Sequence, residues 1–414
     1  MKKTHCIDEQ RRRALALGSG SALAALSGAW PLSVWAKGTY DVGASDKEIK
    51  LGNLHPYSGP ASAYGTCGKS LDAYFKMINA AGGINGRQIK FVTLDDAYNP
   101  AKSVELTRKL VEQEEVLCLF SSLGSSQNLA VRKYLNAKKI PQLFINAGTT
   151  DFGNYKEYPW TMGWQPPYQT EGHIFARHIL ENHPNAKVGV LQQNDDFGKD
   201  NAKGLLDGLG EKAKTLIAQH ITYDLTDPTI DSALVKLQTT GCDVFVNITT
   251  PKFAAQSIRK MAELGWKPAH YLCSVSQSIE SVLRPAGFDN AKGLITAAHL
   301  MEPTSPEAAA DKNMQNYFAF MKAYFPAGDR NDPLNVLGYS VGATMVQVLK
   351  QCGDDLTRDN VMKQAANLKN FAAPLLQPGI VLNTSPTDYY PLKQKVLVRF
   401  NGQRYETITK PLAG

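Results

Sequence analysis

The sequence has few cysteines and no CxxC pair: six cysteines in 414 residues. Setting aside Cys6 near the N-terminus leaves an odd number, five, so neither a zinc site nor a complete disulfide framework is predicted. Cys118 and Cys242 lie in or beside apolar runs, which is typical of buried free thiols.

The chain also lacks a block of basic residues that could follow a phosphate backbone. The formal net charge is +7, of which +3 lies in the first 36 residues, and the remainder is spread thinly. Nucleic acid is therefore not expected as a partner. With 43% hydrophobic and 20% charged residues the composition is that of a folded protein, and 414 residues predict two domains.

No run of about 20 apolar residues is present, which weighs against an uncleaved membrane anchor, the alternative interpretation of the N-terminus. Arginines 11–13 precede a modest apolar stretch with Gly and Ser, and a small-residue cleavage pattern ends at Ala36. This segment resembles a twin-arginine signal. We expect residues 1–36 to be a signal peptide and the cleaved protein to be soluble and periplasmic. No cysteine follows the apolar stretch, so a lipoprotein anchor is not expected.

Two catalytic motifs occur in incomplete form. Residues 338–342 match a G-x-S-x-G nucleophile elbow, but no histidine follows His299 to act as the base, so helix packing is the preferred interpretation of these glycines. Gly68, Lys69 and Ser70 resemble the end of a P-loop, but a long segment separates them from the preceding strand. A helix start with Lys69 in solvent is the simpler interpretation.

Metal-binding patterns are incomplete as well. His173, His178 and His183 are five residues apart, and each such step turns a side chain by roughly 140° on a helix, so they cannot share a metal ion. The paired acids at 95–96, 195–196 and 354–355 have no histidines at ligand spacing. We expect no metal, no cofactor and no enzymatic activity, which indicates a binding protein.

From residue 49 onward, short apolar runs alternate with amphipathic helical patterns, which predicts an α/β fold with parallel sheets. In one helical segment Leu71, Tyr74, Phe75 and Ile78 recur at i, i+3, i+4 and i+7 and predict a buried stripe. The candidate strands include IKLGNL, IKFVTLD, VLCLFSS, PQLFIN, KVGVLQ, AQHITY, DVFVNIT and HYLCSV.

A weak internal repeat divides the chain into two similar halves. A strand followed by Tyr64 and Gly65 in the first half corresponds to a strand followed by Phe197 and Gly198 in the second. The repeat predicts two doubly wound lobes. In such sheets ligands bind beyond the carboxyl ends of the strands, so two facing lobes would enclose one cleft.

The succession IKLGNLHPYSGPASAYG, INAAGGINGRQIKFVTLDDAYNPAKSVELTRKLVEQEEV, SSLGSSQNLAV, NDDFGKD and LGYSVGATMVQVLK resembles the periplasmic binding proteins of branched-chain amino acid type ABC transporters. The resemblance implies a type I periplasmic binding protein fold, in which two Rossmann-like lobes are joined by a three-segment hinge. It implies a first lobe of residues 48–163 and 297–377 and a second lobe of residues 164–296 and 378–410.

The resemblance also implies ligand contacts from both lobes, where hydroxyls and helix starts suit a carboxylate. In the first lobe these residues are Ser58, Tyr64, Ser125, Ser126, Gln127, Asn146, Gly148 and Thr149. In the second lobe they are Asn194, Phe197, Thr250, Lys252, Phe253 and the turn around Ser274 and Ser276. Each serine also suits a helix N-cap, Phe197 an apolar core and Lys252 a solvated helix start.

The sequence departs from the amino acid receptors of this family at one point. Those receptors usually hold the ligand ammonium with an acidic side chain near the turn that here reads CSVSQS, which has no acid. We therefore expect a small hydrophobic or aromatic carboxylate as ligand, with a branched-chain amino acid as the alternative. Glu280 or Asp195 pointing into the cleft would argue against this hypothesis.

The expected function is the substrate-binding component of an ABC importer, a monomer that passes its ligand to a membrane permease with a cytoplasmic ATPase. A ligand-sensing receptor domain is the alternative of another class. Since the sequence stops soon after KQKVLVRFNGQRYETI, we expect any signalling module to come from another polypeptide.

Overall fold

The computed structural model describes residues 38–414, which form one compact unit. The predicted signal peptide and its cleavage site lie outside the described residues. Within 38–414, no helix combines the length and the apolar character needed to cross a membrane. All five cysteines of this range are buried and free, as predicted for Cys118 and Cys242.

The first lobe is built on a five-stranded parallel sheet with the order β3-β2-β4-β5-β6. Its strands are β2 (Glu48–His55), β3 (Gln88–Asp95), β4 (Cys118–Phe120), β5 (Gln142–Ile145) and β6 (Thr161–Gly163). The helices of this lobe are α1 (Gly65–Ala80), α2 (Pro100–Glu112), α3 (Ser125–Ala137), α11 (Pro306–Ala310), α12 (Lys312–Tyr324), α13 (Pro333–Cys352) and α14 (Arg358–Ala365). Short strands β1 (Thr39–Tyr40) and β12 (Asp355–Leu356) pair beside it.

The second lobe is built on an eight-stranded sheet with the order β14-β13-β11-β10-β9-β7-β8, and β15 also pairs with β13. Its strands are β7 (Val188–Gln193), β8 (Ile217–Tyr223), β9 (Val244–Ile248), β10 (Ala269–Leu272), β11 (Ile295–Ala298), β13 (Gln394–Phe400), β14 (Tyr405–Thr407) and β15 (Leu412–Ala413). Its helices are α4 (Tyr168–Asn182), α5 (Asp196–Leu209), α6 (Ala213–Leu216), α7 (Asp231–Thr239), α8 (Pro251–Glu263), α9 (Arg284–Ala286) and α10 (Phe288–Ala291). Strands β7 to β11 are parallel to one another. Strand β13 is antiparallel to its neighbour β11, and β14 is antiparallel to β13.

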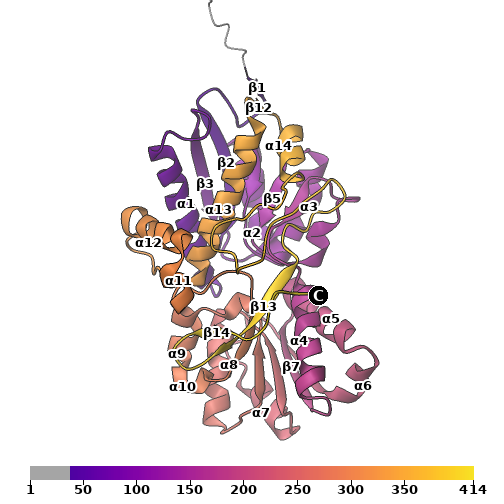
Figure 1. Ribbon diagram of the computed structural model, residues 1–414. Helices are drawn as coiled ribbons and strands as arrows, with labels where there is room; N and C mark the ends of the chain where they lie inside the picture. Colours follow the sequence, from indigo (N-terminus) through magenta and orange to yellow (C-terminus); the bar gives the residue numbers. More distant parts are fainter. Residues whose placement is uncertain (1–37) are drawn as a thin grey trace, which may run out of the picture. The chain divides into compact units, whose positions relative to one another are not determined.

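Alternation along the strands explains why both faces of each sheet are covered. In the first lobe, Leu51 and Phe120 pack in the core under α1 and α13, whereas Leu54 and Leu119 pack in the core under α2 and α3. In the second lobe, one core lies under α4 and α5 and others lie under α7 and α8. Figure 1 shows the helices on both sides of the sheets. The predicted α/β fold of two doubly wound lobes is confirmed.

The chain crosses between the lobes three times. It leaves the first sheet after β6, leaves the second after β11 to form α11–α14, and returns to the second sheet at β13. Figure 1 shows β13, in yellow, reaching from the second lobe to the level where the lobes meet. The lobe boundaries given above stay predictions.

The incomplete catalytic motifs lie inside helices. Lys69 is exposed on α1, which begins at Gly65, so Gly68 and Ser70 lie within the helix rather than in a phosphate-binding loop. On α13, Ser340 is fully buried, and Cβ atoms at Gly338 and Gly342 would lie only 3.0 Å and 2.7 Å from atoms of α1. These glycines therefore allow α13 and α1 to pack closely. In the described part of the chain no group of His, Cys, Asp and Glu could hold a metal ion.

Candidate functional site

A cavity lies between the lobes at the carboxyl ends of both sheets. The first lobe contributes one side chain from the segment after each of its five strands: Tyr64, Tyr98, Leu123, Asn146 and Gln165. The second lobe contributes Phe197 after β7, Thr250 after β9, Ser274, Val275, Gln277 and Ser278 after β10, and His299 after β11. This is the edge of a doubly wound sheet at which ligands bind.

The lobes contact each other around this cavity. Tyr64 and Leu123 of the first lobe pack in one apolar cluster with Val275 of the second. Ser126 on α3 donates a hydrogen bond to Asp196 on α5 at 2.6 Å. The lobes therefore meet around a cavity of about 70 Å³, which is room for several waters or one small molecule.

Among residues 38–414, no Asp, Glu, Lys or Arg side chain lines this cavity. Its apolar wall is formed by Leu123, Phe197, Val275, Leu300, Pro333, Leu334 and Leu337 and by the rings of three tyrosines. Burial raises the pKa of Tyr64, Tyr98 and Tyr168 well above the usual range, so their hydroxyls stay protonated and can donate hydrogen bonds. The cavity thus combines an apolar wall with neutral polar groups.

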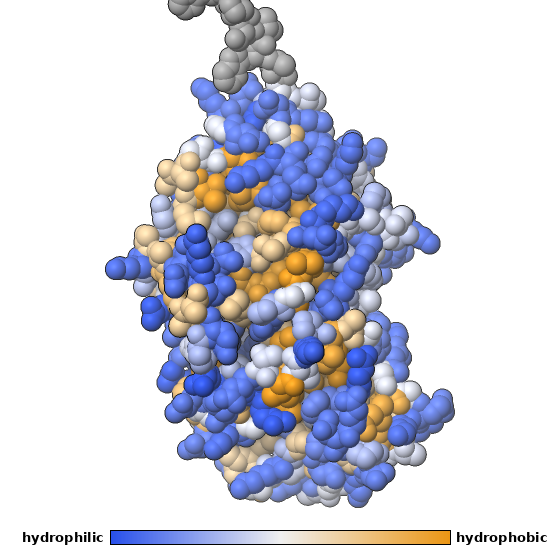
Figure 2. All heavy atoms as spheres, viewed as in Figure 1, coloured by the Kyte–Doolittle hydropathy of each residue, from blue (hydrophilic) through white to orange (hydrophobic). Residues whose placement is uncertain are grey.

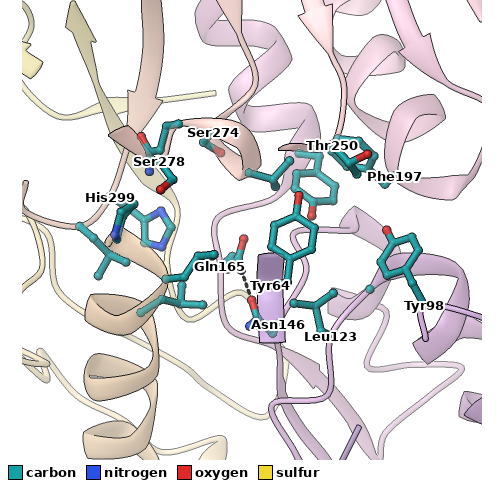
Figure 3. Close-up of a pocket in the computed structure, with 18 residues that line it drawn as sticks. Tyr64, Tyr98, Leu123, Asn146, Gln165, Phe197, Thr250, Ser274, Ser278 and His299 are labelled. Carbon is teal, nitrogen blue, oxygen red and sulfur yellow. Dashed lines mark hydrogen bonds between the residues drawn. The ribbon is translucent and has the colours of Figure 1, made fainter. Parts of the chain in front are cut away.

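The orientation of Asn146 is fixed by three polar neighbours. Its Oδ1 accepts a hydrogen bond from Gln165 Nε2 at 2.6 Å, and its Nδ2 lies 3.4 Å from His55 Nε2 and 3.3 Å from Cys67 Sγ. Figure 3 shows the Gln165–Asn146 bond, with His299 and Ser278 on one side of the cavity and Tyr98 and Phe197 on the other. Gln165 is held in the wall by this bond.

His299 is buried in the wall, only 4% exposed, and neither ring nitrogen has a hydrogen-bond partner among the described residues. Burial, and to a smaller extent the charge of Lys395, lowers the pKa of His299 well below its usual value. The imidazole is therefore neutral, with one N–H donor and one acceptor. A buried polar group without a partner is destabilising.

A buried ion pair supports the wall from behind. Lys395 on β13 and Glu171 on α4 form a salt bridge in which each side chain is 1% exposed. Glu171 accepts a hydrogen bond from the backbone N–H of Ser274 at 2.9 Å, and Lys395 donates one to the Ser274 hydroxyl at 2.9 Å. The pair positions Ser274, and its two opposite charges compensate each other.

Helix α3 begins at the cavity, and no side chain caps its first N–H groups. Its N-cap residue, Gly124, has φ of +103°, and a Cβ atom there would lie 2.1 Å from Gln127 Oε1. Glycine at this position therefore allows the positive φ and the close contact with the Gln127 side chain. Helix α8, which follows Thr250, also begins without a side-chain cap. Uncapped helix N-termini are suited to a negatively charged group.

The model of the periplasmic binding protein family matches residues 48–387. The chain belongs to the periplasmic binding protein family. A Leu/Ile/Val-binding protein homolog 7 of Brucella abortus (strain 2308) is 24% identical over 238 residues, which is 54% of this chain and 57% of that protein. The alignment thus spans little more than half of that relative.

Two solved structures share the fold of this binding protein. One is a branched-chain amino acid ABC transporter protein from Thermus thermophilus with bound valine, with a TM-score of 0.80, 15% identity, and coverage of 89% of this chain and 97% of that chain. The other is a solute binding protein of an ABC transporter from R. palustris in complex with benzoate, with a TM-score of 0.74, 20% identity, and coverage of 89% and 98%. They support the type I fold predicted from the sequence.

The predicted site residues of the binding protein fall into two groups. Tyr64, Asn146, Phe197 and Thr250 line the cavity, as does Ser274 of the predicted turn. The others do not line it: Ser58 bonds to Asp95, Ser125 to Thr149, Ser126 to Asp196, Gln127 to the Tyr98 carbonyl, Asn194 to Asp224, Ser276 to the Thr249 carbonyl, and the Gly148 carbonyl accepts from Tyr168 N–H. Phe253 is fully buried in the core under α7 and α8, and Lys252 is exposed.

Several lining residues were missed by the sequence analysis. Tyr98 follows the strand IKFVTLD, and Gln165 follows the strand that ends at Gly163, so the rule that loops after parallel strands meet would have included both. His299 could not have been found from the sequence, because no local pattern distinguishes a histidine that lines a cavity from one that lies in the core.

Proposed function

We propose that this binding protein is the substrate-binding component of an ABC importer and carries a small hydrophobic or aromatic carboxylate in the interlobe cavity to a membrane permease with a cytoplasmic ATPase. The observation that carries the proposal is that no acidic side chain of the described part of the chain lines the cavity. An ammonium group enclosed there would lose its hydration without gaining a carboxylate partner, at a cost of several kcal/mol.

The two acids named in the sequence analysis are engaged elsewhere. Glu280 accepts hydrogen bonds from Arg284, at 2.7 Å for its Oε1, and Asp195 caps α5 by accepting from Gly198 N–H at 3.0 Å. A carboxylate, by contrast, would meet the uncapped N-terminus of α3, neutral hydroxyls and His299. A branched-chain amino acid stays the alternative. In this proposal the protein is a periplasmic, non-enzymatic monomer.

A thermal-shift screen of the ligand-free protein distinguishes these ligands. Benzoate, hydroxybenzoates, cinnamate and short aliphatic acids are compared with leucine and valine, and benzamide serves as the uncharged control. A ligand at 100 times its Kd should stabilise the protein by about 2.7 kcal/mol, which raises Tm by several degrees. Shifts with acids and not with benzamide are expected. If leucine or valine shifts Tm and the organic acids do not, the proposed ligand class is wrong.

His299→Leu should raise the stability of the ligand-free protein and weaken the binding of its ligand. Since neither ring nitrogen has a protein partner, an apolar side chain of similar size should raise the free energy of unfolding of the ligand-free protein by about 1 kcal/mol. The same change should weaken the ligand found in the screen about tenfold or more, because one polar contact is lost. Urea denaturation and calorimetric titration measure the two effects. Unchanged affinity would remove His299 from the site.

A further inference from the structure

A second cavity lies beside the ligand cavity, where the chain crosses between the lobes, and we name it the hinge chamber. Its volume is about 540 Å³, compared with about 70 Å³ for the ligand cavity. Gln277, Leu300 and Pro333 line both cavities. These three residues therefore form a partition, with the ligand cavity on one side and a larger space on the other.

The buried part of the chamber is largely apolar. Ala298 on β11 pairs with Val396 on β13, and both line the chamber, where they are only 5% and 2% exposed. Val398, on the same face of β13, lines it as well and is 3% exposed. Figure 1 shows β13 and β14 near α11, whose residues Pro306 and Glu307 are exposed at the mouth of the chamber. An apolar floor below an exposed mouth suits a hydrocarbon chain.

The partition has two fixed members and one that can move aside. Pro333 is the first residue of α13, whose N-terminus is capped by Asp332. The Leu300 carbonyl accepts a hydrogen bond from Gln377 Nε2 at 2.9 Å, which holds this segment in place. Gln277 is half-buried, and within residues 38–414 its side-chain amide forms no hydrogen bond. A change in the rotamer of Gln277 therefore breaks no hydrogen bond of the partition.

We propose that the hinge chamber is a subsite for the tail of the ligand: a straight-chain carboxylate has its head in the ligand cavity, and its alkyl chain passes Gln277 into the chamber. The inference rests on the proposed function, because it extends the ligand proposed for the cleft. It assigns a role in specificity to Gln277 and Ala298. Gln277 controls the passage of the chain, and the small side chain of Ala298 leaves space for the end of the chain.

The charges around the two cavities set the orientation of this ligand. Among residues 38–414, three acids and one arginine line the chamber: Glu302, Glu307, Glu406 and Arg404. This excess of negative charge disfavours a carboxylate head in the chamber. The ligand cavity has no acid among its described lining residues, and the uncapped helix α3 begins at its wall. The head therefore belongs in the ligand cavity and the alkyl chain in the chamber.

A length series of straight-chain acids, from butanoate to decanoate, tests the proposal by calorimetric titration. Each added CH₂ that is buried contributes about 0.8 kcal/mol. We therefore expect the affinity to rise about fourfold per CH₂ up to decanoate, with one acid bound per protein. An affinity that stops rising at hexanoate or earlier would overturn the proposal, because the chain would then end at the partition.

Two variants change the subsite in opposite directions. Ala298→Leu fills the buried floor, so it should weaken decanoate about tenfold or more and leave butanoate unchanged. Gln277→Ala widens the partition and should raise the ratio of decanoate to butanoate affinity at least threefold. Ala218→Leu makes the first change at an exposed residue of β8, at the other edge of the same sheet, and should leave both acids unchanged.

Unfolding midpoints show whether each variant is folded, and Gln277→Ala tests the subsite independently of Ala298→Leu. Equal loss of butanoate and decanoate in a folded Ala298→Leu would overturn the proposal. So would an unchanged affinity ratio in Gln277→Ala.

The corresponding 2-amino acids, from 2-aminobutanoate to 2-aminooctanoate, separate this subsite from the choice of head group. If only the amino acids bind, and their affinity rises with length and falls in Ala298→Leu, the carboxylate proposal is wrong and the subsite stands. If short acids bind without a gain from length, the subsite is wrong and the proposed function stands. Binding by no member of either series would overturn the subsite.

Discussion

Replacing Lys395 with methionine should lower the free energy of unfolding by about 3–5 kcal/mol. The side chains of Lys395 and Glu171 are each 1% exposed, so removal of the ammonium leaves a carboxylate buried without its counter-charge. Glu171 keeps the hydrogen bond from the Ser274 N–H, which does not neutralise its charge. Urea denaturation followed by circular dichroism measures the loss.

Two controls make this prediction specific. Lys393 lies two residues before Lys395 and is an exposed partner of Asp388. Lys393→Met should change stability by less than about 1 kcal/mol. The double variant Lys395→Met, Glu171→Leu removes both charges and should recover most of the lost stability. If Lys395→Met destabilises no more than Lys393→Met, the buried pair does not have the role assigned to it.

The same variant should affect the ligand site. Lys395 donates a hydrogen bond to the hydroxyl of Ser274, which lines the cavity. Below the denaturation transition Lys395→Met should therefore bind the ligand more weakly, whereas Lys393→Met should bind it unchanged. This difference follows from the position of the pair directly behind the cavity wall.

Trp164→Ala should also be strongly destabilising, by about 3–5 kcal/mol. Trp164 is 1% exposed, its ring packs edge-on against His299 with centroids 5.7 Å apart, and its Nε1 donates a hydrogen bond to Thr344 at 3.1 Å. Alanine leaves a void behind His299, which lines the cavity, so the ligand affinity should fall together with the stability. Chemical denaturation and titration with the ligand from the screen measure both.

A matched pair of variants separates the volume of Trp164 from its hydrogen bond. Thr344→Val keeps the ring in place and removes the hydroxyl that accepts from Trp164 Nε1 and donates to the Ser340 carbonyl. It should cost about 1–3 kcal/mol because the buried Trp164 N–H is left unsatisfied. Trp164→Phe keeps most of the volume and should lie between Thr344→Val and Trp164→Ala. An alanine variant no less stable than Thr344→Val would show that the ring volume is unimportant.

Periodicity and loop position made much of the fold and part of the site predictable. Fully buried strands such as β7 and β9 are short apolar runs, and the amphipathic stripe of Leu71 and Phe75 predicted α1. Tyr64 and Thr250 were placed at the cavity because each lies in a segment after a strand. Parallel sheets bring those segments to one edge, whichever residues occupy them.

The sequence by itself thus determined the two doubly wound lobes, the family and the edge at which a ligand cavity forms. Only the tertiary structure decided which neighbouring side chain faces the cavity: at the start of α8, Thr250 lines it while Phe253, one helical turn later, is fully buried. The structure also brought together Glu171 and Lys395, which are 224 residues apart, and left the ring of His299 without a hydrogen-bond partner within residues 38–414. The physical reason is that burial and pairing depend on contacts between distant segments, and local sequence patterns do not record those contacts.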